Sequence, residues 1–113
     1  MGEWSKTASG MTVGQPGPQG AIITRDEENA RGVRLTLEED AARGLYSVTV
    51  SIPDWLNYPR FFSSAEAAHA GLEEMHEPLD AIGHELPEIR TPPGDPRTYE
   101  AGARLAALMA RFP

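Results

Sequence analysis

Histidine and acidic residues recur at three- and four-residue steps in the second half of the chain, at His69, Glu73, His76, Asp80 and His84. If this segment is an α-helix, which turns by about 100° per residue, these side chains fall within roughly 80° of arc on one flank. Imidazole nitrogens and carboxylate oxygens one helical turn apart are ligands that Zn²⁺ or a similar divalent ion accepts. The spacing therefore allows a metal site on this flank.

The same flank can also be read as a solvated polar surface, which is common on helices. A single helix seldom supplies more than two or three metal ligands, and the chain has only 3 histidines. The His-Glu-x-x-His signature of zinc proteases is absent, because His84 and Glu85 are followed by Leu86 and Pro87 without a second histidine. We therefore keep metal or small-molecule binding as the alternative and expect no cofactor.

The net charge of −7 comes from one segment, residues 61–89, which contains seven acidic side chains and no Lys or Arg. The rest of the chain is balanced, with 17 − 7 = 10 acidic residues against 10 basic ones. Acidic residues four apart repel each other on a helix, and no cation within the segment relieves them. We expect Glu73, Glu74 and Glu77 to present a negative surface to a basic protein partner. The seven residues are Glu66, Glu73, Glu74, Glu77, Asp80, Glu85 and Glu88.

A second candidate for partner binding is the aromatic loop of Trp55, Leu56 and Tyr58, which lies between Pro53 and Pro59. Aromatic side chains on a stiff loop are common interface anchors, because they bury a large area at low entropic cost. Such a loop would suit a partner with a pocket. The alternative is that Trp55 or Tyr58 folds over one end of the core as a lid.

Motifs for catalysis, nucleic-acid binding and membrane insertion are missing. The chain has no Gly-x-Ser-x-Gly elbow, no glycine-rich phosphate loop and no cysteine to act as a nucleophile. The acidic balance disfavours nucleic acid, whose binding needs Lys and Arg to displace counterions. No apolar run approaches the roughly 18 to 20 residues of a membrane span, and residues 1–20 lack the apolar core of a signal peptide. We expect a protein that is not an enzyme. We also expect it to be cytoplasmic, and the lack of cysteine agrees with that location.

Three segments have the composition and alternation of β-strands, 21–26, 33–38 and 46–52, and residues 60–62 form a short fourth. The connections are too short for helical crossovers, so an antiparallel meander is expected. In the second strand Val33, Leu35 and Leu37 alternate with polar residues. This alternation predicts a sheet with one buried face and one wet face.

At Ser63 and Ser64 the apolar period changes from about 2 to about 3.6 residues, which predicts a helix over residues 64–86. Either serine can cap this helix, and Glu66 completes a capping box with Ser63. Pro78 lies inside the segment, so we expect a kink or a break near Glu77. The apolar stripe that should cover the sheet consists of Ala65, Ala68, Leu72, Met75, Leu79, Ile82 and Leu86.

The chain is expected to divide into four parts. Residues 1–20, rich in Gly, Pro, Ser and Thr, predict a disordered tail, and residues 21–87 form the compact meander and helix. Residues 88–97 predict a semi-rigid, Pro-rich linker. Residues 98–113 predict an amphipathic helix, which is too short to be stable unless it docks on its own sheet, a second subunit or a partner. Its apolar side consists of Leu105, Leu108, Met109 and Phe112.

Together these patterns predict an α+β fold: an antiparallel meander of three to four strands packed on one face by a long helix, plus a C-terminal helix after the linker. A compact part of about 67 residues is marginally stable alone, so we expect a homodimer. For function we expect a small, acidic, non-catalytic domain that binds or regulates another protein. The alternatives are metal or small-molecule binding at the histidine flank, and an enzyme whose site forms between subunits.

Overall fold

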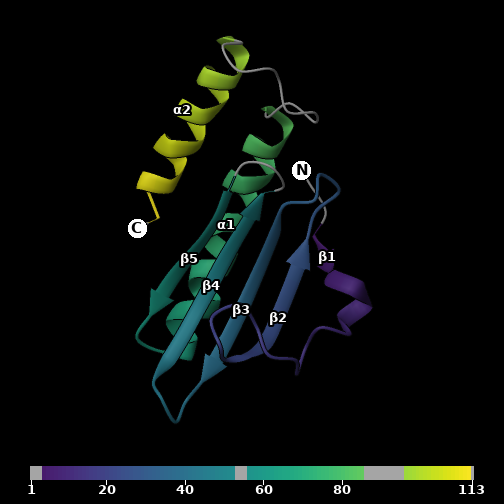
Figure 1. The fold of residues 1–113 in the computed structure, drawn as a ribbon, viewed down its shortest axis with the longest axis vertical. Coiled ribbons are helices and arrows are strands. Elements are labelled where there is room, and N and C mark those ends of the chain that lie inside the picture. Colours follow the sequence, from purple (N-terminus) through teal and green to yellow (C-terminus); the bar gives the residue numbers. More distant parts are fainter. Residues whose placement is uncertain (1–3, 53–55, 86–95, 113) are drawn as a thin grey trace.

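The computed structural model describes residues 4–52, 56–85 and 96–112, with side chains for all of these except residues 56, 83–85, 96–98 and 101. Five strands form one antiparallel sheet in chain order, and α1 (Ala65–Glu85) and α2 (Pro96–Ala110) pack against it (Figure 1). The predicted α+β class is confirmed. The strands are β1 (Ser5–Lys6), β2 (Ile22–Glu28), β3 (Arg34–Asp40), β4 (Leu45–Ile52) and β5 (Leu56–Phe62).

The sheet has one strand more than the three or four that the sequence pattern predicts. β1 places Ser5 opposite Glu28 and Lys6 opposite Glu27, and two residues are too few for an alternating pattern to be detected. A single 3-10 turn, Thr7–Gly10, follows it. The mobility of residues 1–20 and the division of the chain into four parts stay predictions.

β5 is longer than the predicted fourth strand, because it begins at Leu56 and includes Pro59, which lies opposite Thr49. Proline has no N–H to donate to a neighbouring strand. It is tolerated here because β5 is the outermost strand of the sheet, so one side of its backbone needs no strand partner.

A β-bulge at Thr24 changes which residues of β2 face the helices. Ile23 lies opposite Glu38 and Arg25 opposite Leu37, so the pairing shifts by one residue between them. Because side chains alternate along a strand, Arg25 then shares the face of Leu37, which lies in the core under α1. The bulge thus brings the charged end of β2 to the flank of α1.

α1 contacts β3, β4 and β5 through its apolar stripe. It begins after Ser64, whose hydroxyl accepts the N–H of Ala67 at 3.1 Å, so Ser64 is the capping serine. It continues through Pro78 to Glu85 as one helix, and the predicted break near Glu77 does not occur. The buried residues of the stripe are Ala68, Leu72, Met75, Leu79 and Ile82, and they pack on Val33, Leu35, Leu37, Val48, Val50 and Ile52.

α2 folds back on its own chain, beside α1 and in the opposite direction (Figure 1). Leu105, Leu108 and Phe112 are buried in the core shared with α1, and Met109 packs against it. This is the apolar side that the residue spacing predicts. The predicted linker, residues 88–97, lies outside the described residues apart from the backbone of its last two positions.

The face of the sheet opposite α1 is covered at β2 and β3 by the segment that leads into β2 (Figure 1). Glu38 on this face is fully buried, and its carboxylate accepts the backbone N–H groups of Gln19 at 3.0 Å and Ala21 at 3.2 Å. The prediction of a wet face is wrong at this point, because the chain returns over it. Gly17 permits this approach, since a Cβ there would lie 2.3 Å from the carboxyl carbon of Glu38.

Asp26 is a second buried carboxylate on the covered face. It accepts a hydrogen bond from Nε of Arg34 at 2.8 Å and another from the hydroxyl of Thr36 at 3.1 Å. Burial alone would raise the pKa of Asp26, but the hydrogen bonds and the charge of Arg34 outweigh it and lower the pKa below its ordinary value. The ionised form of Asp26 therefore stabilises the fold.

The contact between α1 and β5 predicts an unusual response to alanine. Gly71 is buried, and a Cβ there would lie 2.5 Å from Cζ of Phe62, so Gly71→Ala should lower the free energy of unfolding by about 1 to 3 kcal/mol through overpacking. The matched control is Gly102→Ala in α2, where nothing lies within 4 Å of the added Cβ. It should raise that free energy by about 0.5 to 1 kcal/mol. Urea denaturation measures both, and equal stabilisation by the two would contradict the packing of α1 on Phe62.

The lowered pKa of Asp26 predicts a pH-dependent effect of Asp26→Asn. At pH 7 the variant should lose about 2 kcal/mol of unfolding free energy, because a buried hydrogen-bonded charge is removed. The contribution of the ionised carboxylate is complete above the unfolded pKa of about 3.9 and is lost as the pH falls through the lower folded pKa. The difference between variant and wild type should therefore shrink from pH 5 towards pH 2. A difference that is constant over this range would show that the ion pair does not stabilise the fold.

Candidate functional site

The outward face of α1 is lined by four exposed glutamates, which we call the acidic ridge: Glu66, Glu73, Glu74 and Glu77. Their direction follows from packing, since the opposite side of the helix is the buried apolar stripe. α1 contains no Lys or Arg, so every cation near the ridge comes from another element. Two arginines of the sheet approach it, one on each flank.

Arg25 of β2 connects the sheet to one flank of the ridge. Its guanidinium donates to Glu27 at 2.8 Å and to Glu73 at 3.0 Å, and it lies 3.4 Å from Nδ1 of His69. Burial alone would lower the pKa of Arg25, but the two carboxylates outweigh it and raise the pKa above its ordinary value. Arg25 therefore stays charged and neutralises one flank of the ridge.

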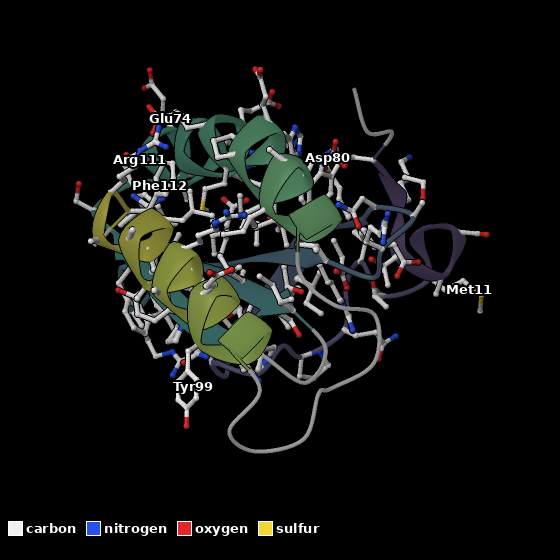
Figure 2. All side chains as sticks on the ribbon, turned by 90° about the horizontal axis from the view of Figure 1, so that it is seen from above. Met11, Glu74, Asp80, Tyr99, Arg111 and Phe112 are labelled. Atoms are coloured by element: carbon white, nitrogen blue, oxygen red, sulfur yellow. The ribbon has the colours of Figure 1, made fainter. Side chains whose placement is uncertain are left out.

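Arg60 of β5 lies on the other flank of α1. Its guanidinium is 4.8 Å from the centre of the Phe62 ring and 5.2 Å from that of Phe112, within the range of cation–π interaction. Burial lowers the pKa of Arg60, and the negative charge of Glu74 acts in the opposite direction. Figure 2 shows Glu74, Arg111 and Phe112 on the same side of the molecule. The C-terminal end of α2 is thus tied to β5 and α1 through one arginine.

The histidine flank of α1 faces acidic residues of the sheet. Nε2 of His69 lies 3.1 Å from Glu39, and Nε2 of His76 lies 2.7 Å from Glu27. The ring of His76 also stacks on Trp4, with 4.9 Å between ring centres. These contacts join the start of the chain, β2, β3 and α1 in one polar network.

The five predicted metal ligands do not share a common set of contacts. Glu73 binds Arg25, and Asp80 is buried and accepts from the side-chain amide of Asn29 at 3.3 Å. His69 and His76 contact the carboxylates of β3 and β2, and the side chain of His84 lies outside the described residues. Within the part of the chain that the structure describes, no three His, Asp or Glu residues form a group that could hold a metal ion. Metal binding stays a prediction without geometric support.

One carboxylate, that of Glu39, lies next to both a histidine and a hydroxyl, which invites comparison with a catalytic triad. Glu39 accepts from the hydroxyl of Thr24 and contacts His69. In a nucleophilic triad the histidine stands between the hydroxyl and the carboxylate, so that it can take the proton from the nucleophile. Here the carboxylate stands in the middle, and the hydroxyl gains no base. The arrangement suits a structural network better than nucleophilic catalysis.

The aromatic loop is only partly described. Trp55 and the side chain of Leu56 lie outside the described residues. Tyr58 is half-buried on β5, opposite Val50 of the core. The prediction that the loop anchors a partner therefore stays a prediction, and the acidic ridge is the part of the predicted binding surface whose geometry can be read.

Comparison with protein-family models, curated proteins and solved structures finds no significant match to the chain. No helix among the described residues is long and apolar enough to cross a membrane. The candidate site therefore rests on geometry and charge alone.

Sequence reasoning missed the contacts of Arg25, which lies at one flank of the ridge. Arg25 lies in the expected first strand, but the bulge that turns it towards α1 leaves no trace in the local pattern. The neighbouring pair Arg60 and Phe62 carries a weak signal, because alternate residues of a strand share a face. Phe112, 50 positions further on, cannot be linked to them by spacing.

The two ion pairs of Arg25 should differ in strength, because the side chain of Glu27 is 18% exposed and that of Glu73 is 62% exposed. Double-mutant cycles with Arg25→Gln should give a coupling of about 1 to 2 kcal/mol with Glu27→Gln, and less than about 0.5 kcal/mol with Glu73→Gln. Urea denaturation at low and moderate salt measures both. A larger coupling with Glu73 would show that Arg25 is held by the ridge instead of the sheet.

Proposed function

We propose that this chain is a non-catalytic domain that binds another protein, and that it presents the acidic ridge of α1 to a basic surface. The carrying observation is the line of exposed carboxylates on a helix that has no Lys or Arg. Among the described residues, Glu66 and Glu77 take part in no ion pair. These two glutamates, the first and the last of the ridge along the helix, therefore keep their charge.

The flanking arginines support this proposal by limiting where the charge is neutralised. Arg25 binds Glu73 on one side, and Arg60 is near Glu74 on the other. A basic partner would find the least compensated charge along the crest, at Glu66 and Glu77. Charge complementarity of this kind mainly speeds encounter and selects the partner. The affinity must come from apolar contacts, for which the aromatic loop at residues 55–58 is the proposed source.

We further propose that the domain works in the cytoplasm. A chain without cysteine gains no stability from an oxidising compartment. Its marginal core must then be supplemented by association instead of disulfides.

The protein that binds the acidic ridge can be identified by crosslinking from α1. A photo-crosslinking amino acid at the exposed Ala70, between the glutamates, should capture the partner in cells, while the same group at the exposed Gln15 of the N-terminal segment should not. Binding to the purified partner is then followed by stopped flow. Glu66→Lys with Glu77→Lys should slow association by about tenfold or more at low salt and flatten its salt dependence.

The control for that experiment is Glu100→Lys, an exposed glutamate at the start of α2 and outside the ridge. This substitution changes the net charge in the same direction as each ridge substitution. It should alter the association rate much less than either of them. If control and ridge variants slow association equally, only the overall charge matters and the ridge is not the binding surface. An unchanged rate in the ridge variant would also refute the proposal.

A further inference from the structure

α1 and α2 enclose an open groove of about 340 Å³ on the outer side of the helix pair. α1 contributes Pro78, Ala81 and Ile82, and α2 contributes Arg104, Leu108 and Arg111. The floor is apolar and continuous with the core, because Ile82 and Leu108 belong to both. The side of α2 next to this groove is smooth, since Ala103, Ala106, Ala107 and Ala110 are small and largely exposed.

The two walls of the groove carry opposite charge. Beside the α1 wall, Glu74 is exposed one helical turn before the lining residue Pro78, and Glu77 is exposed directly before it. On the α2 wall, Arg104 and Arg111 are exposed, and the guanidinium of Arg111 lies 5.5 Å from the Phe112 ring. Figure 2 shows that Arg111 and Glu74 lie on the same side of the molecule. An acidic wall and a basic wall thus border one apolar floor.

We propose that a second copy of this chain docks on the groove and forms a two-fold symmetric dimer of four packed helices. A purely basic partner would be repelled by the α2 wall, and a purely acidic partner by the α1 wall. A second copy brings both signs of charge, and a two-fold axis matches each wall with its opposite. Charge complementarity therefore selects the chain itself as the occupant.

The charges also select the direction of the axis. A two-fold axis that runs along the groove sets α1 of one copy against α2 of the other, with Arg111 near Glu74 and Glu77 of the second copy. An axis across the groove would set α1 against α1 and bring the acidic ridges together, which is repulsive. The apolar floor supplies the affinity, and the charged walls determine the geometry.

The dimer is formed by the chain alone and needs no basic partner, although it shares Glu77 with the proposed partner surface. It would cover Glu74 and Glu77 and leave Glu66 and Glu73 open. Glu66→Lys is therefore expected to weaken binding of a basic partner without changing the dimer, so the two proposals can fail separately.

Sedimentation velocity of the full chain over a wide concentration range tests the dimer. The wild type should pass from a mass of 12.3 kDa towards twice that value, and high salt should shift the transition to higher concentration. Arg111→Glu alone and Glu74→Lys with Glu77→Lys should each abolish the dimer in that range. Mixing these two variants should restore the dimer as a heterodimer. Both walls of one variant are then acidic and both walls of the other are basic, so each wall faces its opposite. Glu66→Lys, one more reversal on α1, is the control and should dimerise as the wild type does.

Circular dichroism spectra identical to the wild type confirm that the variants are folded, and the mixing experiment provides a second check, since unfolded chains would not recover. A mass of 12.3 kDa for the wild type at every concentration would overturn the proposal. A dimer that survives both wall reversals would also overturn it, because the copies would then meet through another surface.

Discussion

The structure depends on one helix that must satisfy two opposite demands. α1 has to cover the apolar face of the sheet with Leu72, Met75 and Leu79, and it contains only acidic charges. Because a carboxylate that is buried without a partner is costly, burying one side of the helix forces the carboxylates to its outside and its flanks. Because the helix has no cation of its own, the sheet supplies them, with Arg25 at one flank and Arg60 at the other. The crest between them is left negative.

This constraint explains why polar residues appear where an ordinary sheet would be apolar. The bulge at Thr24 places Arg25 under the flank of α1, and Glu27 and His76 complete the contact at 2.7 Å. Asp26, one residue away, points to the other face and is held by Arg34. A single irregularity in β2 therefore decides which of these charged residues face α1 and which face the other side of the sheet.

Local patterns predict the elements well, because periodicity reports directly on burial. The apolar stripe from Ala68 to Ile82 and the apolar face of β3 and β4 follow from spacing alone, whereas the burial of the polar residues on the opposite face, such as Glu38 and Ser47, does not. Contacts between distant segments are not encoded in spacing. The approach of Gly71 to Phe62, the burial of Glu38 beneath residues 17–21 and the position of Phe112 over Arg60 each join segments that no periodicity relates. The acidic surface of the site was predictable from composition, whereas the contacts of Arg25 at one flank of it were not.

We expect the crest of α1 to keep a negative potential while its flanks are neutralised. Paramagnetic broadening of backbone amides by a cationic and an anionic nitroxide of the same size measures that potential directly. The amide of Ala70, which lies between Glu66 and Glu73, should be broadened at least about twofold more by the cationic probe, and the excess should decline with salt. The amide of Gly44, in the turn between β3 and β4, serves as the reference and should show a smaller difference. Equal broadening of Ala70 by the two probes would show that the crest carries no excess negative potential.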